Sequence, residues 1–204
     1  MLTLYDFMGS GNGYKVRLLL AHLGLPYKLV ECDILNGETR TPEFLQKNLN
    51  GRIPTLQLED GSYLAESGAI LWYLAEGTAF APADRKTRAE TLQWMFFEQY
   101  SHEPYIAVVR FWRHFFDELT PLQELDLPER VAKGYAALEV MERHLETRSF
   151  FVGKRYGLAD IALYAYTHVA YEGGFDLARY PHINAWLSRV VEQPGYVTMD
   201  HKPA

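Results

Sequence analysis

The pattern of apolar residues changes near residue 77 of the sequence. Before it, short apolar runs typical of strands alternate with helix-like segments; after it, strand patterns disappear. Within the first part, residues 59–62 (Glu-Asp-Gly-Ser) predict a tight β-hairpin turn. This layout predicts an α/β domain followed by an all-α domain.

The first 76 residues predict the element order β-α-β-α-β-β-α. Strands are expected over residues 2–7, 27–33, 55–58 and 63–64, with helices over residues 14–23, from Thr41, and over residues 67–74. A crossover helix makes the first two strands parallel, and the hairpin makes the last two antiparallel. The sequence therefore predicts a thioredoxin-like domain, a small mixed sheet with helices on both faces.

The second part predicts only helices. Residues 77–86 are interpreted as a linker because Gly, Ala, Thr and Pro dominate their first half, and residues 87–204 as an all-helical domain. Helical periodicity covers residues 84–117 with a break near Pro104, and then residues 128–147, 158–171 and 181–191. Residues 120–126 are expected to form a loop. Gly157 is expected to cap the third of these helices weakly, with Asp160 accepting hydrogen bonds from nearby amides.

Composition excludes several classes of function. The net charge is −6 with no basic block, which argues against nucleic acid as a partner. A single cysteine, Cys32, rules out an internal disulfide and fits a reduced, cytoplasmic setting. No signal-peptide pattern and no apolar run of membrane-spanning length is seen, so no membrane association is expected. The seven histidines show no paired spacing on a helix, and no metal is expected.

Three short segments carry the residues suited to binding a small zwitterionic peptide. Ser10 and Asn12 lie in a glycine-rich turn that leads into a helix, where amide N–H groups and the helix dipole favour an anion. Residues 50–56 (Asn-Gly-Arg-Ile-Pro-Thr-Leu) combine a turn, a proline and a short apolar strand. Glu66 and Ser67 start another helix. Taken alone, the first segment is more typical of an ordinary strand-to-helix turn than of a thiol site.

These motifs, with residues 180–186 (Tyr-Pro-His-Ile-Asn-Ala-Trp), resemble the cytosolic glutathione transferases along the whole chain. The run from Ser10 to Lys15 is similar to bacterial members that use a Ser or Thr hydroxyl and an Asn at the thiol, including disulfide reductases. The resemblance implies glutathione as co-substrate, a homodimer, a role in detoxification, and a thiolate that attacks a small hydrophobic electrophile.

The resemblance also implies a role for each site residue. Ser10 would donate a hydrogen bond to the glutathione thiolate and Asn12 a second one, with Tyr5 as the rival hydroxyl. Arg52, or Lys15 in its place, would lie beside the glycyl carboxylate.

The other two segments would hold the rest of the peptide. Ile53 and Pro54, joined by a cis bond, would present backbone groups to the cysteinyl part. Glu66 would pair with the γ-glutamyl ammonium, and Ser67 with the amides of its helix would hold the carboxylate.

The second substrate is expected to contact aromatic residues after Pro104, namely Tyr105, Phe111 and Trp112, and Arg110 beside them suggests an anionic or polar substrate. Three functions stay open from the sequence. The first is a glutathione transferase. The second is a glutathione-dependent disulfide-bond oxidoreductase, in which the thiolate attacks sulfur. The third is a non-catalytic binding module that retains the fold.

Overall fold

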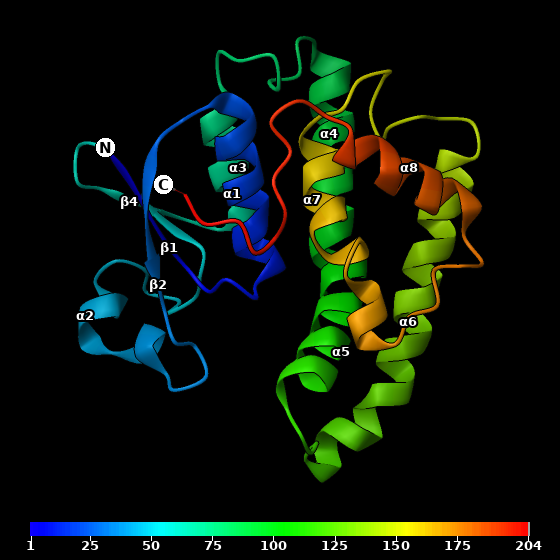
Figure 1. The fold of residues 1–204 in the computed structure, drawn as a ribbon, viewed down its shortest axis with the longest axis horizontal. Coiled ribbons are helices and arrows are strands. Elements are labelled where there is room, and N and C mark those ends of the chain that lie inside the picture. Colours follow the sequence, from blue (N-terminus) through cyan, green and yellow to red (C-terminus); the bar gives the residue numbers. More distant parts are fainter. Residues whose placement is uncertain (204) are drawn as a thin grey trace. The chain divides into compact units, whose positions relative to one another are not determined.

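The computed structural model describes residues 1–203 and divides into two compact units. The first unit contains Met1–Ala81 together with the C-terminal residues from Pro194, and the second contains Pro82–Gln193. Figure 1 shows the elements of each unit along the chain.

The first unit is built on a four-stranded mixed sheet in the order β2-β1-β3-β4. β1 pairs with β2 in parallel, whereas β1 with β3 and β3 with β4 are antiparallel. The elements are β1 (Leu2–Asp6), α1 (Gly11–Leu23), β2 (Tyr27–Glu31), a 3-10 turn (Glu38–Arg40), α2 (Pro42–Leu45), β3 (Thr55–Gln57), β4 (Tyr63–Ala65) and α3 (Ser67–Ala75). The predicted thioredoxin-like order is confirmed.

Side chains along β1 alternate between the two faces of the sheet. Leu4 and Asp6 are fully buried, and because successive side chains of a strand point to opposite faces, Tyr5 lies on the other face. Tyr5 packs edge-on against Phe44 of α2, with ring centroids 6.1 Å apart. The face that carries Asp6 is the face covered by α1, since a Cβ at Gly13 would fall 1.6 Å from the Asp6 Oδ1.

The second unit is all-helical, as predicted. Its elements are α4 (Arg85–Phe97), a π-helical turn (Glu98–His102), α5 (Glu103–Phe115), α6 (Pro121–Leu145), α7 (Leu158–Thr167), a 3-10 turn (Ala170–Gly173) and α8 (Pro181–Val191). The break expected near Pro104 is present: the π-helical turn ends immediately before α5, and Pro104 lies in the first turn of α5.

The loop predicted over residues 120–126 is wrong. Thr120 is the N-cap of α6, and its hydroxyl accepts a hydrogen bond from the Gln123 N–H while the Gln123 side chain accepts one from the Thr120 N–H. Pro121 occupies the first helical turn, where its missing N–H is not needed. This capping box starts the helix at Pro121 rather than at Pro128, which lies inside it.

The core of the second unit surrounds α7, all of whose residues are buried. Asp160, in its first turn, accepts hydrogen bonds from the N–H groups of Phe151 and Gly157 at 3.0 Å and from the Trp186 indole at 2.9 Å. The bond from the Gly157 N–H is the one expected from the sequence. Asp160 thereby ties the start of α7 to α8 and to the loop before it.

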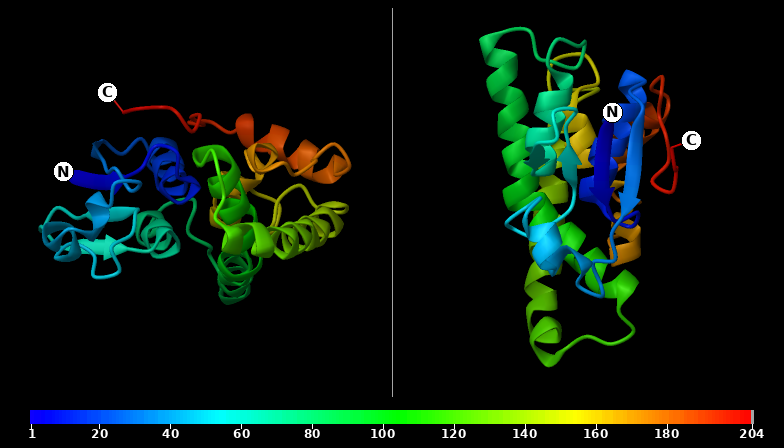
Figure 2. Two further views of the ribbon diagram at one scale, coloured as in Figure 1. Left: turned by 90° about the horizontal axis from the view of Figure 1, so that it is seen from below. Right: turned by 90° about the vertical axis from the view of Figure 1, so that its left-hand side faces the viewer.

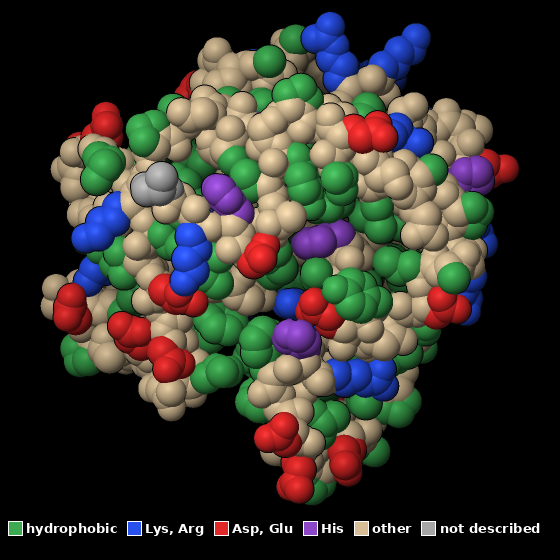
Figure 3. Space-filling view, in the orientation of Figure 1, with side chains coloured by type: hydrophobic (Ala, Val, Ile, Leu, Met, Phe, Trp, Pro, Cys, Tyr) green, Lys and Arg blue, Asp and Glu red, His purple; other side chains and the backbone are tan. Residues whose placement is uncertain are grey.

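Charged side chains of both signs are scattered over the face drawn in Figure 3. Among residues 1–203, none of the helices combines the length and apolar character needed to span a bilayer.

Candidate active site

The glycine-rich turn joins β1 to α1 and ends in a helix cap. Ser10 is the N-cap residue, in an extended conformation, and its hydroxyl accepts a hydrogen bond from the Gly13 N–H at 3.4 Å. Its own N–H donates to the Phe7 carbonyl at 2.8 Å, which tightens the turn. Because the Ser10 oxygen acts as acceptor for the helix, its hydroxyl hydrogen can still be donated to a ligand. The capping role and a role at the thiol are therefore compatible.

Asn12 lies where the N-termini of α1 and α3 meet. Its Oδ1 accepts a hydrogen bond from the Lys15 Nζ at 2.8 Å and lies 3.5 Å from the Ser67 Oγ. An ammonium can only donate, so the atom of the Asn12 carboxamide that faces Lys15 is its oxygen, and the NH₂ forms the other branch. Lys15 is 1% exposed, so its ammonium contacts Asn12 inside the unit. This buried position does not fit the alternative role of Lys15 beside an exposed glycyl carboxylate.

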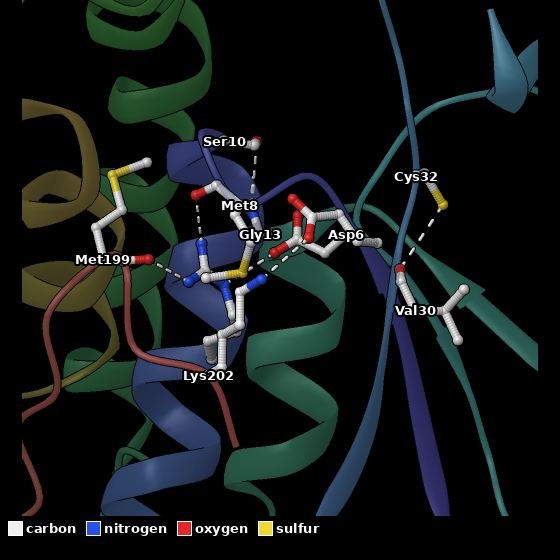
Figure 4. A network of polar contacts seen from close by, with 10 residues as sticks. Asp6, Met8, Ser10, Gly13, Val30, Cys32, Met199 and Lys202 are labelled. Carbon is white, nitrogen blue, oxygen red and sulfur yellow. Dashed lines mark hydrogen bonds and ion pairs between the residues drawn. The ribbon is translucent and has the colours of Figure 1, made fainter. Parts of the chain in front are cut away.

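A buried ion pair supports the turn from below. The Arg17 Nε donates to the Asp6 Oδ2 at 2.9 Å, and its Nη2 donates to the Met8 carbonyl at 3.0 Å. Both side chains are at most 1% exposed. Burial raises the pKa of Asp6 to about 7 in spite of the Arg17 charge beside it, which acts in the opposite direction. Figure 4 shows Asp6, Met8, Ser10 and Gly13 grouped at the start of α1.

Tyr5, the rival hydroxyl, faces away from this group. It lies on the sheet face opposite Asp6, with its ring between Phe44 and Tyr63 and the Lys47 ammonium 5.6 Å from its centroid. Burial, followed by the nearby Tyr63, raises the pKa of Tyr5, so its hydroxyl is not activated. Both observations favour Ser10 over Tyr5 as the group at the thiol.

The turn before β3 contains the predicted cis bond, between Ile53 and Pro54. A side chain that the sequence interpretation missed shapes this turn: Asn48, 9% exposed, donates from its Nδ2 to the Arg52 carbonyl at 2.8 Å and to the Thr55 hydroxyl at 3.2 Å. Within the described part of the chain, no hydrogen bond occupies the backbone N–H or carbonyl of Ile53. These groups are available to pair with an extended ligand.

Glu66 has an unusual backbone. Its φ is 66°, and it is the one non-glycine residue with positive φ among residues 1–203. Such a conformation is unfavourable for a residue with a Cβ and is found disproportionately at functional sites. Glu66 is the N-cap of α3 but makes no side-chain cap, so its exposed carboxylate is not used by the helix. Ser67 is the first residue of α3 and is 5% exposed.

Strand pairing brings the predicted segments to one end of the sheet. Thr55 pairs with Tyr5 of β1 and with Ala65 of β4. Because β3 is antiparallel to both, the residues before Thr55 lie beside those that follow Ala65 and those that follow Asp6. Ile53–Pro54, Glu66–Ser67 and the Ser10 turn therefore meet at the same sheet end. Arg52 is exposed beside them.

The aromatic residues expected at the second substrate all lie on α5 in the second unit. Tyr105 lies under the Lys133 ammonium, 5.4 Å from its ring centroid, and Trp112 under the Arg130 guanidinium, at 5.1 Å. Phe111 packs on other aromatic rings, with its centroid 5.3 Å from that of Phe115. Tyr105 and Trp112 thus face α6, whereas Phe111 does not share their contacts.

Two further side chains with charged or nucleophilic groups, Arg110 and Cys32, are buried. Arg110, suggested as a contact for an anionic substrate, is 4% exposed and is paired with Glu172, whose Oε2 lies 2.6 Å from its Nε. Cys32 is 2% exposed, and burial, with smaller contributions from Glu38 and Asp6, raises the pKa of its thiol to about 11, so it is a poor nucleophile. Residues 1–203 contain no group of three or more His, Cys, Asp or Glu side chains arranged to hold a metal ion.

Comparison with known proteins agrees with this architecture. Residues 1–76 match the family model of the glutathione S-transferase N-terminal domain, and residues 111–194 match that of the C-terminal domain. The chain is 32% identical over 201 residues to the disulfide-bond oxidoreductase YfcG of Escherichia coli K12, covering 95% of this chain and 92% of that protein. The chain therefore belongs to the glutathione S-transferase family.

The chain is also similar to solved structures of glutathione transferases. A possible glutathione S-transferase from Rhodopseudomonas palustris shares 53% identity and a TM-score of 0.95, covering 100% of this chain and 91% of that one. A glutathione transferase from Burkholderia graminis, solved with two glutathione molecules bound per subunit, shares 32% identity and a TM-score of 0.83, covering 95% of this chain and 85% of that one.

Proposed function

We propose that this protein binds glutathione at the sheet end described above and activates its thiol as a thiolate for attack on a small hydrophobic electrophile. The observation that carries the proposal is the convergence of three segments whose polar groups suit the parts of glutathione. They are the Ser10–Asn12 turn, the backbone of Ile53, and Glu66–Ser67 at the start of α3. Each segment matches one chemical part of the tripeptide.

The γ-glutamyl end is assigned to Glu66 and Ser67. An ammonium and a carboxylate must be held side by side there. The exposed Glu66 carboxylate pairs with the ammonium. The first amide N–H groups of α3, which have no side-chain cap, donate hydrogen bonds to the carboxylate together with the Ser67 hydroxyl.

The cysteinyl part is assigned to Ile53, whose N–H and carbonyl would form a short antiparallel ladder with the peptide. Arg52, exposed next to it, is assigned to the glycyl carboxylate. These assignments place the thiol toward the start of α1.

The thiol is assigned to the Ser10 turn. A free thiol has a pKa of about 8.5, and one at a helix N-terminus with hydrogen-bond donors can be lowered by a unit or more. Ser10 donates to the sulfur, and the NH₂ branch of Asn12, whose oxygen is held by Lys15, donates a second bond. Ser10 stabilises the anion and is not itself the nucleophile.

A second candidate is glutathione-dependent reduction of a disulfide. It is favoured by the similarity to the disulfide-bond oxidoreductase YfcG and by the Burkholderia structure with two glutathione molecules per subunit. In this reaction the thiolate attacks one sulfur of the disulfide and the other leaves as a thiolate. A rate on a small disulfide well above that on an aryl halide would select this candidate, and the reverse would select the transferase.

The residues proposed to contact the second substrate are Tyr105, Phe111 and Trp112. Replacing each by Ala and comparing KM for the acceptor with KM for glutathione tests them, since a contact with the acceptor raises only the former. Because Tyr105 and Trp112 contact α6, we expect the larger change from Phe111→Ala.

We further propose a cytoplasmic homodimer that acts in detoxification. Phe96 and Tyr100, on α4 and the turn after it, are 67% and 82% exposed and four residues apart, and a patch of exposed aromatic side chains is a candidate interface. Light scattering at micromolar protein tests the dimer, and a monomer mass would reject it.

Calorimetric titration with glutathione tests the binding site. The native chain is expected to bind, Glu66→Ala to weaken binding roughly tenfold or more, and Ser10→Ala to leave affinity nearly unchanged. Glu59→Ala, an exposed acid at the opposite end of the β3–β4 hairpin, is the matched control and should bind normally. If the native chain shows no binding, the non-catalytic module becomes the better interpretation.

A further inference from the structure

The C-terminal segment, residues 194–203, runs along α1 in the first unit. The Pro194 carbonyl lies 2.8 Å from the His22 Nδ1, and the Val197 carbonyl accepts a hydrogen bond from the Tyr14 hydroxyl at 2.7 Å. Gly195 has a φ of 80°, and a Cβ there would lie 3.1 Å from the His22 Cα, so the segment is in close contact with the helix. Both views of Figure 2 show it beside α1.

One contact links this segment to the turn that we assign to the thiol. The Arg17 Nη1 donates a hydrogen bond to the Met199 carbonyl, while its Nη2 donates to the Met8 carbonyl and its Nε to Asp6. A single guanidinium, 1% exposed, therefore joins the C-terminal segment, the turn before Ser10 and the end of β1. In Figure 4, dashed lines join the carbonyl oxygens of Met199 and Met8 to the same guanidinium.

We propose that the C-terminal segment is a positioning element for the thiol-binding turn and acts through Arg17. This inference rests on the proposed function of Ser10. Met8 lies two residues before Ser10, and the Arg17 bond to its carbonyl holds the turn from beneath. The Asp6 carboxylate fills the space under the first turn of α1, against Gly13.

The planar fork of arginine explains why all three contacts depend on one another. The guanidinium N–H groups are fixed in one plane, so the direction of the Nη2 bond to Met8 is set by the partners of Nε and Nη1. Loss of the Met199 carbonyl leaves a buried donor unpaired, which favours rotation of the guanidinium or entry of water. Either change moves the Met8 carbonyl and, with it, the Ser10 hydroxyl.

The experiment compares two shortened chains. The test chain ends at Tyr196 and loses Val197 and Met199; the matched control ends at His201, which keeps them and the turn in which the His201 N–H donates to the Thr198 carbonyl at 3.1 Å. The thiol pKa of bound glutathione is read from thiolate absorbance against pH, beside kcat and KM.

The test chain is expected to raise the thiol pKa by about half a unit to one unit and to lower kcat at neutral pH roughly threefold to tenfold, with KM for glutathione changed less than about twofold. The control is expected to match the full chain. Arg17→Lys, which keeps the charge but cannot reach three partners, should raise the pKa in the full-length protein and reports even if the test chain does not fold.

A lower melting temperature with an unchanged thiol pKa in both variants would overturn the proposal and leave the segment a purely stabilising element. Ser10→Ala is measured in parallel. If it raises the thiol pKa and the Arg17 variant does not, only this inference fails; if it does not, the assignment of the thiol to the Ser10 turn fails as well.

Discussion

Each unit of the molecule contains one fully buried aspartate whose pKa burial raises to about 7, and the two are held in different ways. Asp6, in the first unit, faces the charged Arg17 with one oxygen, and its other oxygen, Oδ1, accepts no hydrogen bond among the described residues. Asp160, in the second, accepts three hydrogen bonds from uncharged N–H groups.

The two aspartates therefore differ in what they stabilise: Asp160 stabilises the core of its unit, whereas Asp6 stabilises a turn of the candidate site. The donors to Asp160 come from a helix start, a loop and an indole, so it joins elements of the core and faces no turn that carries a candidate ligand group. Asp6 lies under the first turn of α1, and its partner Arg17 also holds the turn before Ser10. The incomplete hydrogen bonding of Asp6 fits a group whose surroundings serve binding as well as stability.

The largest effect is expected for Asp160→Ala. Three buried donors, on Phe151, Gly157 and Trp186, lose their acceptor, and each unsatisfied group is unfavourable, so the free energy of unfolding should fall by about 4 kcal/mol. Urea denaturation measures this loss. The thiol pKa of bound glutathione should not change in the folded protein; a raised thiol pKa would break the distinction between the two aspartates.

Gly13→Ala should have the next largest effect. The new Cβ would fall 1.6 Å from the Asp6 Oδ1 in a buried ion pair, so either the carboxylate or α1 must shift, which costs about 2 to 3 kcal/mol. Gly157→Ala is the control, because its φ is −157° and nothing lies within 4 Å of the added Cβ. Equal stability of the two variants would contradict the close packing of Asp6 against α1.

The pH dependence of stability is expected to give the smallest change at each step of the measurement, because it is spread over about three pH units. Because the pKa of Asp6 is raised from 3.8 to about 7 on folding, the folded state binds more protons than the unfolded state between those values. Its contribution is therefore fully present below about pH 4 and is lost as the pH rises through 7, at no more than about 1.4 kcal/mol per pH unit.

Asp6→Asn should remove the contribution of Asp6 to the pH dependence of stability. The difference in unfolding free energy between variant and native protein should then change with pH between about 4 and 7 and be constant above pH 7. The quantity to measure is the difference in unfolding free energy between the two proteins. Burial lowers the pKa of His168 to about 4, and below about pH 6.5 this gives the native protein an opposing slope of unfolding free energy against pH. A difference that does not vary with pH would mean that Asp6 titrates normally.

Local patterns predicted most of the fold because each element carries its own signal. Gly24, at φ 63°, ends α1 as expected, and Thr41 with Pro42 starts α2. The start of α6 differs from the predicted loop because Thr120 and Gln123 form a capping box, whose spacing in the sequence outweighs the loop-like composition around them.

The candidate site was predictable where it follows strand order and unpredictable where it depends on contacts distant in sequence. Ser10, Ile53 and Glu66 follow from motifs placed at strand ends. The positive φ of Glu66 and the Asn48 bonds behind the cis bond have no such motif. The Arg17 contact with Met199 joins residues from opposite ends of the chain, and no local pattern points to it.

Thiolate stabilisation by Ser10 is best tested by the thiol pKa of glutathione bound to the native protein and to Ser10→Ala. We expect a pKa lowered by about one unit or more from the free value of about 8.5 in the native complex, and a return toward that value in Ser10→Ala with glutathione affinity retained. An unshifted thiol in the native complex, or the same lowered pKa in both proteins, would contradict the assignment of thiolate stabilisation to the turn at the start of α1.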